Sequence, residues 1–183
     1  EWFIKEKSII YDLGCSTGET AKNLCSIYKS KNFKYYGYDL SSTMIKIAKN
    51  KNKKDNKKIT FKLGDINKIN FKKKSDLFLS ILTFPFLNSQ QRIGLFKKIY
   101  KSLNHGGALI FVDKIRSSSS VYEDMFNQAL YDFKIEKKLK SEQVLNKSKS
   151  IRSAMQLFEV DEINTFLKKA GFKKKEFFFK WFN

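Results

Sequence analysis

The sequence contains few of the residues that build disulfide frameworks, zinc sites and sharp breaks in regular structure. It has two cysteines, Cys15 and Cys25, one histidine, His105, and one proline, Pro85. No apolar run approaches the ~20 residues that cross a bilayer, and no signal peptide is visible. Disulfides and metal chemistry are therefore not expected. The single histidine, His105, is expected to lie on a surface turn. We expect a cytoplasmic protein without a membrane partner.

Arginine is also scarce, although the chain is strongly basic. The formal net charge is +19, yet only three of the 37 cationic residues are arginine. Because the planar fork of arginine is the usual reader of phosphates and bases, a surplus of lysine is weak evidence for a built nucleic-acid site. We expect the lysine-rich stretches 51–58 and 72–74 to be solvated loops. The surface should attract nucleic acid only non-specifically, and salt should weaken that attraction.

Short apolar runs alternate with amphipathic segments through the first two thirds of the chain. Strands are predicted at 9–13, 33–40, 59–63, 76–82 and 108–113, and helices at 17–29, 43–50 and 89–102. This alternation predicts an α/β fold, namely a doubly wound, Rossmann-like, mostly parallel sheet flanked by helices. At 183 residues the chain is long enough for one domain with a sizeable core.

The last third breaks this alternation. Helices are predicted at 121–137 and, loosely, at 141–157, forming a helical insertion at about 117–157 within a single domain that spans 1–183. A further helix is predicted at 161–170, with Gly171 as its C-cap, and the aromatic stretch 172–182 indicates a strand. Because the chain enters its first strand almost at once and stops after an apolar run, we expect both ends to be truncated.

One stretch joins a buried strand to a glycine-framed turn. The run Ile9–Leu13 is followed by Gly14, Cys15, Ser16, Thr17 and Gly18, and then by a helical segment. Glycine allows a sharp turn and a close approach to a ligand, and an open α/β sheet binds nucleotide-like ligands at such a turn. Ser16 stands where a G-x-G-x-x-G loop has its second glycine, which disfavours NAD, and no P-loop motif is present.

Two acids follow the next two strands at a spacing that fits an adenosine. Asp39 would accept hydrogen bonds from both ribose hydroxyls, and Asp65 from the adenine amino group, with the Ile66 backbone N–H at a ring nitrogen. Leu40 and Met44 would flank the base. The structural alternatives are that Asp39 only caps a helix and that Asp65 only forms a turn.

These motifs resemble a known family. Residues 12–18, Asp39 and 64–66 are similar to the class I S-adenosylmethionine-dependent methyltransferases. The resemblance is narrowed to the carboxy-S-adenosylmethionine synthase branch by Ser16 and by four further stretches, namely 98–109, 132–134, 169–172 and the final 181–183. That branch transfers a carboxyl group from prephenate to the sulfonium methyl group, which makes the donor for a wobble-uridine modification in tRNA.

The resemblance implies a cofactor, a site and an assembly. The implied cofactor is S-adenosyl-L-methionine or its carboxylated form. The implied substrate is a small molecule, with prephenate as the candidate, and the implied assembly is a homodimer. The implied cofactor-binding residues are Asp12, Gly14, Cys15, Ser16, Gly18, Asp39, Leu40, Met44, Asp65, Ile66 and Ile81. Cys15 is expected to pack under the cofactor and not to act as a nucleophile.

The chain also departs from the family pattern. Ile81 stands where the family has an asparagine, and 147–150 stands where the family has the arginine that holds the added carboxylate. Lys149 is the candidate catalytic partner of that carboxylate, with a solvated helix lysine as the alternative. Tyr122 and Tyr131 could line an acceptor pocket, or pack in the core or a dimer. An ordinary small-molecule or tRNA methyltransferase and a degenerate, non-catalytic binding module stay open as alternatives.

Overall fold

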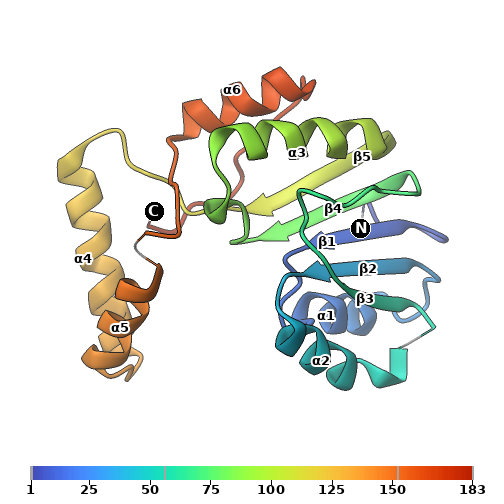
Figure 1. Ribbon diagram of the computed structural model, residues 1–183, viewed down its shortest axis with the longest axis horizontal. Coiled ribbons are helices and arrows are strands. Elements are labelled where there is room, and N and C mark those ends of the chain that lie inside the picture. The colour runs from blue at the N-terminus through green and yellow to red at the C-terminus, as the bar shows by residue number, and fades with distance from the viewer. Residues whose placement is uncertain (1, 56, 152, 183) are drawn as a thin grey trace.

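The computed structural model describes residues 2–55, 57–151 and 153–182, and its centre is a parallel sheet with helices on both faces (Figure 1). The strands are β1 (Ile9–Leu13), β2 (Lys34–Asp39), β3 (Ile59–Leu63), β4 (Ser75–Ile81) and β5 (Leu103–Val112). All neighbouring pairs are parallel, and the strand order is β3-β2-β1-β4-β5. This is the doubly wound arrangement that the alternation predicts.

Six α-helices are present within the described residues. They are α1 (Glu19–Ile27), α2 (Ser42–Lys51), α3 (Ser89–Ser102), α4 (Ser120–Glu136), α5 (Ser141–Ile151) and α6 (Val160–Ala170), with short 3₁₀ turns η1 (Lys53–Asp55) and η2 (Phe84–Phe86). Local chemistry explains several helix ends. The Ser41 side chain caps α2, Asn88 and Gln91 form a capping box on α3, and Gly171, at φ 111°, ends α6.

The sheet has a hydrophobic core on each face. Ile10 and Cys15 pack with α1 and α2 on one face, whereas Tyr11 and Leu13 pack with α3 and α6 on the other. Figure 1 shows these two helical layers on opposite sides of the strands. Because consecutive side chains of a strand point to opposite faces, the apolar side chains of β1 contribute to both cores.

The chain winds outward in two directions from the boundary between β1 and β4. From β1 it proceeds to β2 and β3, and from β4 it proceeds to β5. In open α/β sheets, ligands bind at the carboxyl ends of the strands where the winding direction reverses. The turn after β1 lies at this position.

Helices α4 and α5 pack on each other beyond the carboxyl ends of β4 and β5 (Figure 1). None of the 17 residues of α4, all of which are described, is buried. The segment after α5 returns to the sheet, where Gln156 N–H donates to Pro85 O at 2.7 Å and Phe158 bridges Ile115. No helix in the described parts of the chain is long and apolar enough to span a membrane.

Three of the predicted elements are wrong in type or extent. The stretch 172–182 forms no strand, because strand backbone needs a pairing partner and nothing among the described residues pairs with it. Helix α5 ends at Ile151 and not at 157. Strand β5 begins at Leu103 and not at 108, so His105 lies in a strand and not in the predicted surface turn. The register of β5 is irregular opposite Ser75 and Leu77. Asn56, Arg152 and Asn183, which belong to predicted segments or motifs, lie outside the described residues.

Candidate functional site

The turn after β1 has a backbone that requires glycine at two positions. Gly14 has φ 85° and Gly18 has φ 77°, and a Cβ on Gly14 would lie 1.9 Å from Thr83 Oγ1. The Gly14 and Cys15 N–H groups both donate to Tyr38 O, at 2.8 and 2.9 Å. The turn is therefore pressed against the end of β4 and tied to the end of β2.

Asp39 connects this turn to the start of α2. Its Oδ2 accepts from Ser16 N–H at 2.8 Å, and its Oδ1 accepts from Ser41 N–H at 2.9 Å. The bond to Ser16 supports a left-handed backbone at that residue, with φ 47°. An ionised carboxylate has about four acceptor positions, so Asp39 keeps the capacity to bind further donors. Asp39 therefore holds the turn against Ser41, the N-cap residue of α2, and keeps acceptor capacity for a ligand.

Asp65 and Ile66 follow β3 in a tight turn. Asp65 Oδ1 accepts from the Asn67 backbone N–H at 2.9 Å and from Asn67 Nδ2 at 3.2 Å. The Ile66 side chain is buried in the core that also holds α3 and α6. Asp65 thus takes part in the turn after β3, and its role toward a ligand stays a prediction.

Large apolar side chains are exposed where the strands end. They include Leu40 after β2, 73% exposed, and Ile81 at the end of β4, 48% exposed, along with Leu63, Leu82 and Val112. Met44 is half-buried, with its Sδ 3.9 Å from Ser16 Oγ. Exposed apolar surface at the winding reversal suits a ligand with a flat apolar part.

Asp12 lies inside the molecule and not at the surface of the turn. It is 2% exposed, and its Oδ2 accepts a hydrogen bond from the Tyr35 hydroxyl. Burial raises the pKa of Asp12 to about 6, the Tyr35 bond lowers it, and the charge of Asp39 raises it. Its predicted contact with a cofactor stays a prediction.

Cys15 is part of the core beneath the turn. It is 5% exposed, and burial raises the pKa of its thiol, with Asp12 and Asp39 raising it further. Because the thiolate is the nucleophilic form, such a thiol is unreactive at neutral pH. Packing is the role that this environment supports. Among the described residues, no group of His, Cys, Asp and Glu is arranged to hold a metal ion.

The remaining candidates lie outside this turn. Lys149 is exposed on α5, and His105 is exposed in β5. Tyr122, 57% exposed, lines a cavity of about 340 Å³ together with Phe126 and Lys180, and Tyr131 is 39% exposed. Packing of the two tyrosines in the core is therefore wrong, because α4 lies away from both cores.

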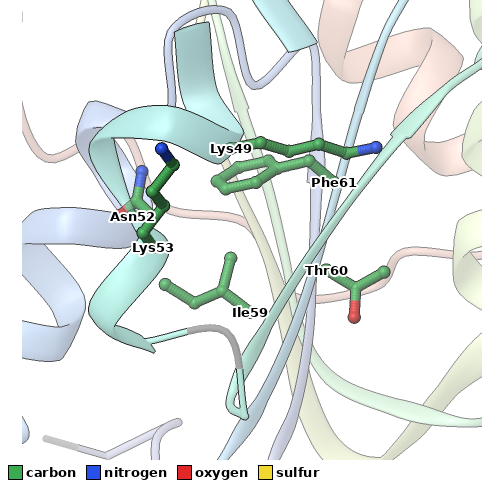
Figure 2. Close-up of a pocket in the computed structure, with 6 residues that line it drawn as sticks. All are labelled: Lys49, Asn52, Lys53, Ile59, Thr60 and Phe61. Atoms are coloured by element: carbon green, nitrogen blue, oxygen red, sulfur yellow. The ribbon is translucent and has the colours of Figure 1, made fainter. Parts of the chain in front are cut away.

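A second hollow, of about 530 Å³, lies between α2 and β3 (Figure 2). It is lined by Lys49, Asn52, Lys53, Ile59, Thr60 and Phe61. Strand β3 is at the outer edge of the sheet, separated from β4 by the two strands β2 and β1. The hollow is thus separate from the winding reversal.

The sequence did not reveal a buried ion pair behind the end of β5. Arg92 is fully buried, and its Nη1 donates to Asp113 Oδ2 at 2.5 Å. Its Nη2 donates to Gln156 O at 3.1 Å. The available signal was an arginine near the start of a helix, one turn before the apolar Leu95 and Phe96, in a chain whose cations are almost all lysine.

Comparison with known proteins decides the family. A family model described as a methyltransferase domain matches residues 10–107. A carboxy-S-adenosyl-L-methionine synthase from Staphylococcus epidermidis is 37% identical over 182 residues, which cover 100% of this chain and 78% of that protein. The chain belongs to the class I S-adenosylmethionine-dependent methyltransferases, in their carboxy-S-adenosyl-L-methionine synthase branch.

Further relatives agree with this family assignment. A synthase from Campylobacter hominis is 32% identical over 180 residues, covering 98% of this chain and 76% of that protein. A solved S-adenosylmethionine-dependent methyltransferase from Clostridium acetobutylicum is 30% identical with a TM-score of 0.50, covering 56% of this chain and 41% of that one. A methyltransferase structure from Bacillus halodurans has a TM-score of 0.69 at 15% identity, covering 94% of this chain and 66% of that one. At this low identity the likeness shows the fold alone.

The methyltransferase is thus a transferase whose cofactor is S-adenosylmethionine. The residues at the winding reversal fit this cofactor. The Gly14–Gly18 turn brings backbone close to a ligand, Asp39 has acceptor capacity for ribose hydroxyls, and exposed Leu40 offers an apolar surface for a base.

Proposed function

We propose that this methyltransferase is a carboxy-S-adenosylmethionine synthase that uses prephenate as its carboxyl donor. The observation that carries the proposal is the likeness to the synthases along the whole chain. The general methyltransferase model ends at residue 107, whereas the synthase match continues through α4, α5 and α6. The insertion is therefore shared with enzymes of this named activity.

In the proposed site, the chain's own residues bind and orient the cofactor. Asp39 accepts hydrogen bonds from the ribose, Asp65 and Ile66 meet the adenine edge, and Leu40 and Met44 flank the base. Bound S-adenosylmethionine supplies a methyl group activated by the sulfonium. In the overall reaction the carboxyl group of prephenate moves to that methyl carbon, and phenylpyruvate and one water are released. Lys149 is the proposed partner of the added carboxylate.

Calorimetry tests the cofactor part of the proposal. S-adenosylmethionine should bind, NADH should not, and Asp39→Asn should weaken S-adenosylmethionine binding by about tenfold or more, the loss expected for one charge-assisted hydrogen bond. Tight binding of NADH without binding of S-adenosylmethionine would refute the assignment.

Incubation with prephenate tests the reaction. The full-length protein, S-adenosylmethionine and prephenate should yield phenylpyruvate and a cofactor whose mass has increased by one carboxyl group in place of a hydrogen. Unchanged cofactor, with binding intact, would argue against the synthase activity.

A second candidate is a binding module that no longer turns over. It is favoured by Ile81, an exposed apolar residue at the cofactor edge where the family has an asparagine, and by the absence of arginine at 147–150. The mass of any nucleoside that co-purifies distinguishes the candidates. A carboxylated cofactor supports the synthase, and unmodified S-adenosylmethionine that prephenate leaves unchanged supports the module.

We also propose the finer features that the resemblance implies. These are a cytoplasmic homodimer serving tRNA modification, and a single domain whose insertion spans about 117–157. The free, buried thiols of Cys15 and Cys25 support a reducing compartment. Exposed apolar side chains on α4, such as Val121 and Met125, support a contact with a second copy.

A further inference from the structure

Strand β3 has a free side. It pairs with β2, and no strand in the described parts of the chain pairs with its other side, which is the β3 edge. Directly after β3, Gly64 N–H donates to Asp39 O of β2 at 2.9 Å. Because successive residues of a strand direct their backbone groups to alternate sides, the odd-numbered residues direct theirs outward. The N–H and C=O groups of Ile59, Phe61 and Leu63 therefore face the β3 edge.

The hollow of about 530 Å³ lies along this edge (Figure 2). One side is formed by Ile59, Thr60 and Phe61, and the other by residues at the end of α2 and in η1. The Thr60 side chain points to the opposite face of the sheet from Ile59 and Phe61. A hollow lined by all three residues therefore extends over the edge of the strand, and it leaves space for a further extended segment.

The surroundings of the β3 edge are strongly basic. Residues 49–63 include seven lysines and a single acid, Asp55. Lys49 and Lys53 are exposed and line the hollow, and Lys62 is exposed on β3 itself. Among the described residues, no ion pair includes any of these three lysines. An acidic segment would therefore be attracted to the edge, and a basic segment would be repelled.

A buried polar atom in the wall of the hollow lacks a partner. Asn52 lines the hollow and is 4% exposed, and its Nδ2 donates to Ala48 O at 2.9 Å and to Gly18 O at 3.3 Å. Its Oδ1 is enclosed and accepts no hydrogen bond from the described residues. Because a buried acceptor without a donor is unfavourable, a donor that enters the hollow would stabilise this wall.

We propose that the β3 edge binds an acidic, extended segment of another protein, which adds a strand to the sheet. The outward backbone groups of β3 supply the hydrogen bonds, and Lys49, Lys53 and Lys62 select carboxylate side chains. A second copy of this chain is a poorer occupant, because the lysines of two facing β3 edges would repel each other. The β3 edge is separate from the winding reversal, so this inference does not depend on the proposed function.

Hydrogen exchange followed by NMR tests which backbone groups bind. The probe is an eight-residue peptide of alternating glutamate and valine with blocked ends. In the free protein the amides of Ile59, Phe61 and Leu63 should exchange faster than those of Thr60 and Lys62. Millimolar peptide should slow exchange at the first three by about tenfold or more. Unchanged exchange at these amides would overturn the proposal. Protection that instead grows with protein concentration, without peptide, would assign the edge to a second copy and also overturn it.

Calorimetry with matched variants separates strand addition from general charge attraction. Lys49→Glu combined with Lys53→Glu should weaken peptide binding by about tenfold, because two attractions become repulsions. Lys97→Glu combined with Lys101→Glu, on the exposed side of α3, makes the same change in net charge and should alter binding less than twofold. The same peptide with alternate backbone nitrogens methylated should not bind, because it cannot complete the ladder. An equal loss in both double variants, or equal binding of the methylated peptide, would overturn the proposal.

Discussion

Gly14 combines a left-handed backbone with a neighbour that leaves no space for a side chain. A Cβ there would overlap Thr83 Oγ1, and φ is 85°. The left-handed conformation alone costs a non-glycine residue about 1–2 kcal/mol. Gly14→Ala should lower the free energy of unfolding by about 2 kcal/mol or more, and weaken S-adenosylmethionine binding. Denaturant titration and calorimetry measure the two effects.

Gly94 provides the control for that substitution. It is exposed in the middle of α3, and a Cβ there would have no heavy atom within 4 Å. Gly94→Ala should raise the free energy of unfolding by about 0.5–1 kcal/mol, because alanine is the better helix former. Equal stability of the two variants would contradict the role given to the Gly14 backbone.

The raised pKa of the buried Asp12 carboxyl predicts an unusual pH dependence of stability. Its pKa is raised from 3.8 to about 6, so the folded state retains a proton that the unfolded state releases between these values. The free energy of unfolding should therefore fall as pH rises from about 4 to about 6, by about 3 kcal/mol, and then level off. Asp12→Asn lacks this titration.

Denaturant titrations of the wild type and Asp12→Asn at pH 4 and pH 7 measure this effect. The stability of the variant relative to wild type should improve by about 3 kcal/mol between the two pH values. A difference that does not change with pH would show that Asp12 titrates normally in the fold.

At the scale of elements, one ion pair joins three parts of the chain. Arg92 on α3 donates to Asp113 after β5, to Leu87 O at 3.2 Å, and to Gln156 O after α5. Removing one partner of a buried pair costs about 3–5 kcal/mol, because the other charge is left unpaired. Arg92→Met should therefore destabilise the protein by that amount, as measured by denaturant titration.

A double-mutant cycle checks the origin of this cost. Arg92→Met with Asp113→Leu should be less destabilising than the sum of the two single substitutions, since no unpaired charge remains. Additive effects would mean that the pair does not link α3 to the end of β5.

The helices and strands also show where local sequence patterns were insufficient to predict secondary structure. The helix at Ser89–Ser102 and the strands Ile9–Leu13 and Ile59–Leu63 have the predicted bounds, because apolar spacing and caps within the segment determine them. The stretch 172–182 has strong strand propensity, yet Phe178 is 76% exposed and no strand forms. Strand propensity acts only when a neighbouring strand completes the hydrogen bonds.

For the whole molecule, charge predicts weak and non-specific attraction to polyanions. The net charge is +19, and most of the cations are on exposed lysines. Binding of an unrelated tRNA, followed by fluorescence anisotropy, should weaken by about tenfold or more between 50 and 200 mM salt, and should not depend on nucleotide sequence. Salt-resistant binding of one RNA would instead indicate a specific site.

The sequence by itself determined the alternation of strands and helices, the glycine turn, the acids that follow the strands, and the family. These features depend on residues that are close together in the chain, so they can be predicted from the local order and spacing of residue types. Only the tertiary structure decided that Asp12 faces Tyr35 inside the core and that Arg92 pairs with Asp113. The physical reason is that burial and long-range electrostatics depend on partners distant in the chain, which are brought together only when the sheet and its helices pack.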